Sequence, residues 1–261
     1  MKEKVIITGI SKGIGRAMAE EYRDRGYNVI GTCRNPDQLT DKLEGVTYAA
    51  LEMNDRESID RFAGQYSDAD ILINNAGQSQ ISPSEIIPAS EIDRYFDLNI
   101  INLIYLTNKY IPGMRERRKG TIVNISSMQG RMPLPFCSIY SATKHALEGY
   151  SKSLHHELLN FGVRVIVISP GFIKTTIKQK SYIEGSSPYH EDYMKVKSYR
   201  DGNISRGVSA QSLAEEIVRI TGLKNPSMSY VLGGKSPFLY FLVKILPERL
   251  LKKVFRKILN L

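Results

Sequence analysis

Tyr140 and Lys144 are the residues of this chain whose types and spacing most clearly suggest chemistry. They stand four positions apart within residues 138–161, where apolar residues recur at helical spacing, so both side chains are expected on one helix face. A phenol has a pKa of about 10 and exchanges protons poorly at neutral pH unless a nearby cation stabilises its phenolate. We expect Lys144 to be that cation. Lowering the phenol pKa by about 3 units would take roughly 4 kcal/mol of preferential stabilisation.

Ser127 could complete such a proton-transfer site. It follows the apolar run 122–125, which is expected to be a buried strand, and a strand end beside the start of a helix can hold a carbonyl group. A Tyr-x-x-x-Lys spacing also arises by chance on amphipathic helices. The interpretation therefore depends on what the rest of the chain supplies.

A glycine-rich turn follows the first apolar run, residues 4–7. The turn reads Thr8-Gly9-Ile10-Ser11-Lys12-Gly13-Ile14-Gly15 and leads into a helical pattern over residues 16–25. Glycines let the backbone approach a pyrophosphate, and a helix N-terminus presents unpaired N–H donors to it. The same residues contain a formal nucleophile elbow, Gly9-x-Ser11-x-Gly13, which would indicate a serine hydrolase. That elbow normally lies deeper in the sheet and precedes an acid and a histidine, so dinucleotide binding is favoured.

The second expected strand, residues 27–32, carries no acid at its end, where a carboxylate would bind the adenosine ribose of NAD. Arg34 stands there instead. A guanidinium suits the 2′-phosphate of NADP, and Lys12 in the glycine turn could be its second cation. An exposed loop arginine is the simpler alternative, and Asp37 is the residue that could reverse the preference. NADP(H) is therefore expected over NAD(H).

Strands and helices alternate along the remaining chain with short turns between them. Further strands are expected at residues 46–51, 70–73, 121–125, 163–168 and 229–232, with helices at 55–66, 89–118, 138–161 and 209–223. This alternation predicts an α/β fold, a Rossmann-type doubly wound parallel sheet of about seven strands with helices on both faces. Residues 176–206 are polar, tyrosine-rich and weakly periodic, which is typical of a lid or binding loop.

Two polar features interrupt these elements. Asn74-Asn75-Ala76-Gly77 is a tightly turning strand end, where ligands bind in such sheets. Asn99 breaks the apolar pattern of the helix expected at 89–118. A buried asparagine must be hydrogen-bonded, and a structural bridge is its simplest interpretation.

Composition is that of an ordinary globular protein, with 42% hydrophobic and 24% charged residues in 261. We expect one catalytic domain over residues 1–235. Two cysteines and no signal-peptide pattern indicate a reducing, cytoplasmic setting, and no metal site is expected. The net charge is +9, but seven basic residues and one acidic residue fall between Lys235 and Leu261, so most of the excess lies in the tail. Nucleic-acid binding is disfavoured, because stacking aromatics are not interleaved with these basic residues.

The tail, residues 236–261, has the pattern of a basic amphipathic segment. Its apolar stripe, Leu250, Leu251, Val254, Phe255 and Ile258, lies opposite Arg249, Lys252, Lys253, Arg256 and Lys257. The tail is too short and too charged to span a bilayer. It could lie on an anionic membrane surface, or pack on its own domain or on a second subunit. A homo-oligomer is expected, with the number of subunits left open.

Several motifs in order, over roughly residues 3–235, resemble the classical short-chain dehydrogenase/reductase family. They are Thr8-Gly9-x-x-x-Gly13-x-Gly15, Asn74-Asn75-Ala76-Gly77, Asn99, Ser127, Tyr140-x-x-x-Lys144 and Pro170-Gly171-x-x-x-Thr175. The resemblance implies an NAD(P)-dependent oxidoreductase that interconverts a carbonyl compound and its alcohol. A non-catalytic dinucleotide-binding module would keep the glycine turn but need not keep the remaining motifs.

The resemblance also assigns roles to individual residues. Tyr140 would be the general acid in reduction and the base in oxidation, and Lys144 would lower its pKa and hold the nicotinamide ribose. Ser127 would hydrogen-bond the substrate oxygen, chosen over Ser126 because its spacing of 13 residues from Tyr140 is the family's usual one. Asn99 would hold a water in a proton relay.

The implied cofactor contacts extend over the whole carboxyl edge of the sheet. They are Gly9, Ser11, Lys12, Gly13, Ile14, Gly15, Arg34, Glu52, Met53, Asn75, Ala76, Gly77, Asn99, Tyr140, Lys144, Pro170, Gly171, Ile173 and Thr175. Glu52 departs from the family, which usually has an aspartate near the adenine. Residues 75–79 and 138–142 are similar to 17β-hydroxysteroid dehydrogenase-like enzymes and acyl-dihydroxyacetone-phosphate reductases. That similarity suggests a hydrophobic or lipid-like carbonyl substrate and a role in lipid metabolism.

Overall fold

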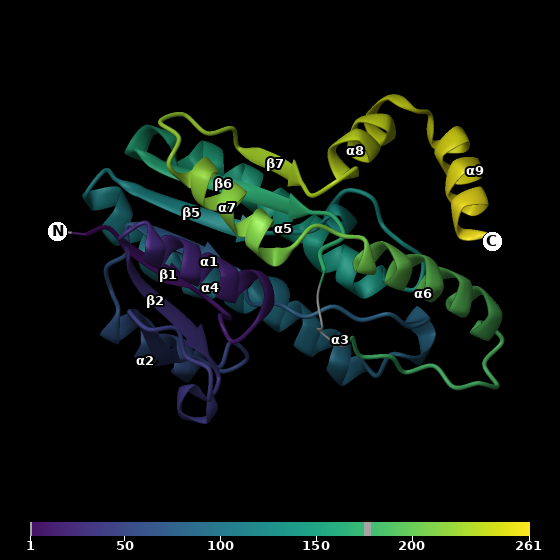
Figure 1. The fold of residues 1–261 in the computed structure, drawn as a ribbon, viewed down its shortest axis with the longest axis horizontal. Coiled ribbons are helices and arrows are strands. Elements are labelled where there is room, and N and C mark those ends of the chain that lie inside the picture. Colours follow the sequence, from purple (N-terminus) through teal and green to yellow (C-terminus); the bar gives the residue numbers. More distant parts are fainter. Residues whose placement is uncertain (1, 175–178) are drawn as a thin grey trace.

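One seven-stranded parallel sheet forms the centre of the protein (Figure 1). The computed structural model describes residues 2–174 and 179–261. The strands are β1 (Lys4–Ile7), β2 (Asn28–Cys33), β3 (Val46–Ala50), β4 (Ile71–Asn74), β5 (Gly120–Ile125), β6 (Val163–Pro170) and β7 (Ser229–Leu232). They pair in the order β3-β2-β1-β4-β5-β6-β7. The predicted Rossmann-type doubly wound sheet is confirmed.

Helices cover both faces of this sheet (Figure 1). They are α1 (Gly13–Asp24), α2 (Arg56–Gln65), α3 (Ala89–Phe96), α4 (Asn102–Glu116), α5 (Ser138–Leu158), α6 (His190–Ser205), α7 (Ala210–Thr221), α8 (Ser236–Ile245) and α9 (Glu248–Leu259). Side chains alternate across a strand, so Val5 and Ile7 pack under α1 and α7, while Ile6 packs under α2, α4 and α5. A strand buried on both faces needs apolar residues at successive positions, which explains the run in β1.

The helix expected over residues 89–118 is broken in the middle. α3 ends at Phe96, a π-helical turn spans Asp97–Ile101, and α4 begins at Asn102, whose N–H donates to the carbonyl of Asp97. The apolar residues on either side of this turn recur at helical spacing, so the sequence predicted one continuous helix. Single π-turns inside helices often mark functional positions, and this one contains Asn99.

The loop expected over residues 176–206 contains a regular helix, α6, so that prediction was wrong for residues 190–205. Tyr193, Val196 and Arg200 form its buried face. One of these buried residues is charged, and Met194, which is exposed, is apolar. The helix therefore has no clean amphipathic pattern. α6 lies beyond the carboxyl ends of the strands (Figure 1).

The tail forms two helices, α8 and α9, that extend beyond the sheet toward α6 (Figure 1). The start of the tail is fixed to the body, because the Arg131 guanidinium stacks on the Tyr240 ring at 4.6 Å. Near its end, Leu259 is buried against α6. Within residues 2–174 and 179–261, no helix is both long enough and apolar enough to cross a bilayer.

Candidate active site

The predicted site residues follow the carboxyl ends of β1, β2, β4, β5 and β6, on both sides of the point between β1 and β4 where strand order reverses. The glycine turn follows β1, Asn75 to Gly77 follow β4, Ser127 follows β5, and Gly171 follows β6. Parallel strands present their carboxyl ends at one edge, and the crevice at such a reversal is where doubly wound sheets bind nucleotides. The structure therefore gathers these motifs, far apart in sequence, along a single edge.

The glycine turn needs its glycines for two different reasons. Gly9 and Gly13 adopt left-handed backbone conformations, with φ of +75° and +63°. At Gly15 a Cβ atom would come within 2.2 Å of the Gly9 carbonyl oxygen and 2.5 Å of the Asn75 amide nitrogen. Only glycine therefore allows α1 to start this close to the turn. Lys12 precedes α1 without a side-chain cap on its N–H groups, which suits an anion at that end.

Hydrogen bonds fix the loop after β4 against the glycine turn. The Thr8 hydroxyl oxygen accepts the N–H groups of Asn75 and Ala76 at 3.0 and 2.9 Å. The Asn75 amide in turn donates to the carbonyls of Thr8 and Gly9 at 2.9 and 3.0 Å. The side chain of Asn75 thus shapes the cofactor turn, and Ala76 packs directly over Gly9.

The two cations expected near the 2′-phosphate occupy neighbouring strand ends. Lys12 follows β1, Arg34 follows β2, and both are exposed. Asp37, the residue that could have favoured NAD, is also exposed, in a short 3-10 turn. Within the described part of the chain, no ion pair involves any of these three residues. The geometry is compatible with a phosphate between the two cations.

Glu52 and Met53, which were predicted to contact the cofactor, make contacts within the protein itself. The Glu52 carboxylate accepts the Asn54 N–H at 3.0 Å, and the Glu52 N–H donates to the Ser58 hydroxyl at 3.0 Å. Met53 is buried in the apolar layer beneath α2. Its side chain therefore faces the core, and any contact with an adenine would have to involve its backbone.

The segment after β6 packs tightly against two later elements. A Cβ atom at Gly171 would lie 1.7 Å from the Ser236 hydroxyl oxygen, so only glycine fits beside the start of α8. Ile173 is buried and forms a bridge with Val208. Pro170 closes β6. Thr175, the last of the predicted cofactor contacts, lies outside the described residues.

Tyr140 and Lys144 lie together on α5, as their spacing predicts. The Lys144 Nζ is 5.8 Å from the centre of the Tyr140 ring, and it donates a hydrogen bond to the Ile125 carbonyl at 2.8 Å. Ser127 is half-buried two residues beyond that carbonyl, and its oxygen accepts the Gln129 N–H at 3.2 Å. This bond leaves the hydroxyl proton of Ser127 available for donation. Ser126 is buried.

The pKa of Tyr140 does not follow the prediction. Desolvation in the crevice raises the pKa of Tyr140, while the neighbouring Ser127 hydroxyl acts in the opposite direction. Burial lowers the pKa of Lys144 to about 8, against the smaller opposing effect of Glu148. The pKa of the phenol is therefore raised, where the sequence predicted a lowered one. Loss of water disfavours the charged forms of both groups, and in each of them it outweighs the favourable neighbours.

Asn99 is buried, and its amide is occupied by structural hydrogen bonds. Its oxygen accepts the Gln78 N–H at 2.9 Å, and its nitrogen donates to the Gln78 carbonyl at 2.8 Å and to Thr143 at 3.2 Å. The side chain thus bridges the loop after β4 to α5. A water held by Asn99 would have to bind its backbone within the π-helical turn.

Arg200 is a residue of this site that the sequence did not single out. It lies on the buried face of α6 and is 6% exposed. Burial raises the pKa of Tyr140 and of Cys137, and the positive charge of Arg200 opposes that rise in each. The sequence did not reveal Arg200, because this residue belongs to no motif and lies among polar residues in a segment whose apolar residues recur only weakly.

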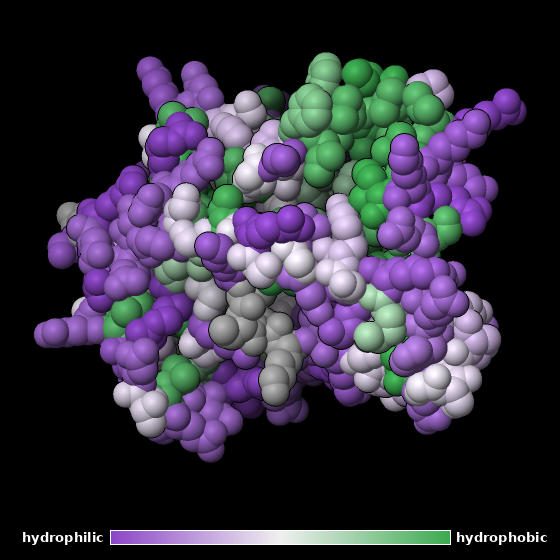
Figure 2. Space-filling view, turned by 45° about the vertical axis from the view of Figure 1, so that its right-hand side comes forward, coloured by the Kyte–Doolittle hydropathy of each residue, from purple (hydrophilic) through white to green (hydrophobic). Residues whose placement is uncertain are grey.

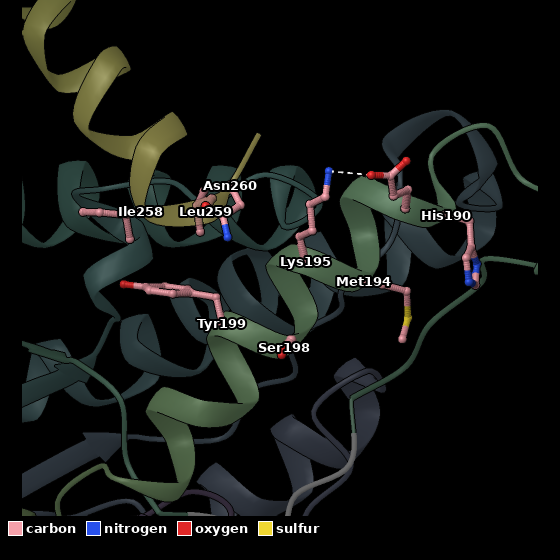
Figure 3. A pocket seen from close by; sticks show the side chains of 9 residues that line it. His190, Met194, Lys195, Ser198, Tyr199, Ile258, Leu259 and Asn260 are labelled. Carbon is pink, nitrogen blue, oxygen red and sulfur yellow. Dashed lines mark ion pairs between the residues drawn. The ribbon is translucent and has the colours of Figure 1, made fainter.

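A separate cavity of about 730 Å³ lies between α6 and α9 (Figure 3). Tyr199 and Ile258 approach each other at one side of it, while Lys195 pairs with Glu191 at 2.8 Å on its rim. None of the predicted catalytic residues lines this cavity. It belongs to the contact between the tail and α6.

Comparison with known proteins identifies the chain's family. Residues 3–184 match the profile described as short chain dehydrogenase. The protein belongs to the short-chain dehydrogenase/reductase family. It is therefore an NAD(P)-dependent oxidoreductase, as the motifs predicted.

Several relatives match over nearly their full length. The chain is 28% identical to an NADPH-dependent 3-dehydrocapnine reductase of Ornithobacterium rhinotracheale, covering 97% of this chain and 95% of that one. It is also 28% identical to a 3-ketodihydrosphingosine reductase of Bacteroides thetaiotaomicron, over 97% and 96%. A short-chain dehydrogenase structure from Streptomyces avermitilis superposes with a TM-score of 0.80 at 30% identity, over 92% and 91%.

Proposed function

We propose that this protein is an NADPH-dependent reductase of a hydrophobic or lipid-like ketone, with Asn99, Ser127, Tyr140 and Lys144 as its active-site residues. The observation that carries the proposal is that Tyr140 and Lys144 lie together on α5 beside the carboxyl end of β5, which Ser127 follows, next to the loop after β4. The two named relatives above are both called reductases, and one is called NADPH-dependent. Their names support a ketone as the group acted on.

Reduction builds negative charge on the carbonyl oxygen, and the described residues would meet that charge. NADPH, when bound, would supply the hydride to the carbonyl carbon. Ser127 would donate a hydrogen bond to the oxygen, and Tyr140 would donate a bond and then its proton. Lys144, behind the phenol, would stabilise the phenolate that remains. Asn99 would hold the loop after β4 in place through Gln78.

The raised pKa of Tyr140 favours the reductive direction. A phenol with a raised pKa is fully protonated at neutral pH, which is the form that an acid needs. It still protonates an alkoxide readily, because a secondary alkoxide is much more basic than a phenolate. Oxidation needs the phenolate instead, so we expect the reverse reaction to require a higher pH.

The preference for NADPH rests on Lys12 and Arg34. Both are exposed at adjacent strand ends, and the second strand ends without a carboxylate to bind a ribose 2′-hydroxyl. Two cations around one phosphate would give charge-assisted hydrogen bonds that NADH cannot make. The remaining predicted cofactor contacts lie along the same edge of the sheet.

The tail, residues 236–261, is proposed as a membrane-binding appendage of a catalytic domain that ends near Lys235. Figure 2 shows a continuous apolar surface over α8 and α9. The exposed side chains there are Phe238, Phe241, Ile245, Leu250, Val254 and Ile258. Five basic residues lie on α9 among and beside them, against Glu248 alone. An apolar surface with cationic neighbours suits the interface of an anionic bilayer, from which a lipid-like substrate could enter.

An absorbance assay tests the enzymatic part of this proposal. Purified protein is mixed with NADPH and a panel of ketones that differ in chain length, including 2-butanone, 2-decanone and methyl 3-oxodecanoate. We expect NADPH oxidation that rises with chain length and is slower with NADH. Turnover of only short polar ketones would contradict the lipid-like substrate, and no turnover of any ketone would contradict the reductase.

Flotation with phosphatidylglycerol vesicles at low salt tests the tail. We expect the full chain to float, and the double variant Phe238→Ser, Phe241→Ser and a chain lacking its last 20 residues to remain at the bottom. The matched control is Phe161→Ser, because Phe161 is exposed on the body of the protein. If the full chain does not float, and these variants instead change its oligomeric state, the surface is a subunit interface.

A further inference from the structure

α6 places one arginine in a setting where charged residues are rarely found. Arg200 is 6% exposed, and it shares its helix face with Tyr193 and Val196, at 4% and 0%. Tyr193 packs in one apolar cluster with Cys137, the residue that precedes α5. The arginine is thus held between α6 and the start of the helix that carries Tyr140.

Arg200 has no partner among the described residues. No hydrogen bond or ion pair joins its guanidinium to any of residues 2–174 or 179–261. The adjacent acid, Asp201, is exposed and pairs with Lys197 at 2.6 Å. A buried and unpaired cation costs several kcal/mol, so such groups are normally found paired. A partner for this charge must therefore come from outside the described residues.

The surroundings of Arg200 locate that partner near the reacting groups. Arg200 shares the buried face of α6 with Tyr193, which packs with Cys137 three residues before Tyr140. Burial raises the pKa of Tyr140 and of Cys137, and the positive charge of Arg200 opposes that rise in both. The cations proposed for the cofactor phosphate, Lys12 and Arg34, follow β1 and β2, whereas Cys137 follows β5. Arg200, close to Cys137 and the start of α5, is therefore on a different part of this edge from the two cations proposed for the cofactor phosphate.

We propose that Arg200 binds an anionic group of the substrate, a carboxylate, sulfonate or phosphate close to the carbonyl that is reduced. A planar guanidinium matches such oxygens with two parallel hydrogen bonds, and a desolvated site strengthens them. The inference rests on the proposed reductase function and adds the chemical class of its substrate: an amphiphile with an anionic group near the ketone and an apolar remainder. Tyr193, on the same face of α6 as Arg200, packs in an apolar cluster with Ile81 and Leu134.

The test uses a pair of ligands that differ only in charge. The ratio of kcat/KM for 3-oxodecanoate over its methyl ester is measured with NADPH, in wild type and in Arg200→Met. Calorimetric binding of 3-hydroxydecanoate and its methyl ester to the protein saturated with NADPH gives the same ratio without turnover, because an alcohol and NADPH cannot exchange hydride. Lys197→Met is the matched control, since it removes an exposed positive charge from the same helix. Arg200→Lys keeps the charge but not the planar guanidinium, and its acid-to-ester ratio is measured as well, so that the test remains possible if Arg200→Met does not fold.

We expect wild type and Lys197→Met to prefer the acid, and Arg200→Met to lose about tenfold or more of that preference, with Arg200→Lys between them. A wild type without the preference, or an Arg200→Met that keeps it, would overturn the proposal. Weaker NADPH binding with an unchanged acid-to-ester ratio would also overturn it, by making Arg200 a cofactor ligand. If neither ketone is reduced but the binding preference depends on Arg200, the anion site stands and the reductase proposal fails.

Discussion

Replacing Lys144 with methionine measures how strongly the site disfavours charge. Burial lowers the pKa of Lys144 from 10.5 to about 8. At pH 7 both the native and the unfolded states carry the proton, and the shift costs the native state about 3 kcal/mol. Between pH 8 and 10.5 the unfolded state binds more protons than the native state, so stability rises with pH. The stability of wild type relative to Lys144→Met should therefore increase by about 2.5 kcal/mol from pH 7 to pH 10.

Urea unfolding of both proteins at pH 7, 8, 9 and 10 gives this difference directly. Titrations common to both proteins cancel, and a constant offset from the lost Ile125 hydrogen bond does not affect the slope. Lys152→Met is the control, because this lysine lies on the same helix with a side chain 43% exposed, and a much smaller change is expected. A flat or falling difference for Lys144→Met would refute the desolvated amine.

The remaining predictions concern the cofactor and the core. Lys12→Ala and Arg34→Ala should each raise the KM for NADPH by about tenfold or more while leaving that for NADH nearly unchanged, since each removes one charge-assisted contact with the 2′-phosphate; equal effects on both cofactors would contradict the assignment. Arg131→Met should lower the free energy of unfolding by about 3 kcal/mol, because it removes the partner of buried Glu148 at 3.0 Å and leaves only the more exposed Lys152 at 3.5 Å. The double variant Arg131→Met, Glu148→Met should recover most of this loss in urea unfolding, and no recovery would count against the buried ion pair.

The fold and the grouping of the motifs could be predicted because they depend on local spacing. Apolar runs bounded by turns gave the strands, and a separation of four residues in a helix placed Tyr140 and Lys144 on one face. The family was predicted from several motifs in order, none of which is specific alone. The match of residues 3–184 to the family profile confirmed it. The catalytic and cofactor roles of these residues remain predictions.

What could not be predicted depends on tertiary surroundings. The π-helical turn at Asp97–Ile101 could not be predicted, because the interruption by Asn99 does not distinguish a polar residue in a regular helix from a wider turn. α6 was missed because Arg200, a charged residue expected at the surface, occupies a buried position of the helix. The pKa of Tyr140 was predicted in the wrong direction, because the sequence shows the neighbouring cation but not the loss of water.

The central claim is that Tyr140 gives its proton to the carbonyl oxygen during hydride transfer. Single-turnover oxidation of enzyme-bound NADPH, followed by stopped-flow absorbance with a ketone that wild type reduces, tests it in Tyr140→Phe. The claim predicts a rate lower by about 10²- to 10⁴-fold, with the Kd for NADPH largely retained. A phenylalanine variant that oxidises NADPH at nearly the wild-type rate would contradict it.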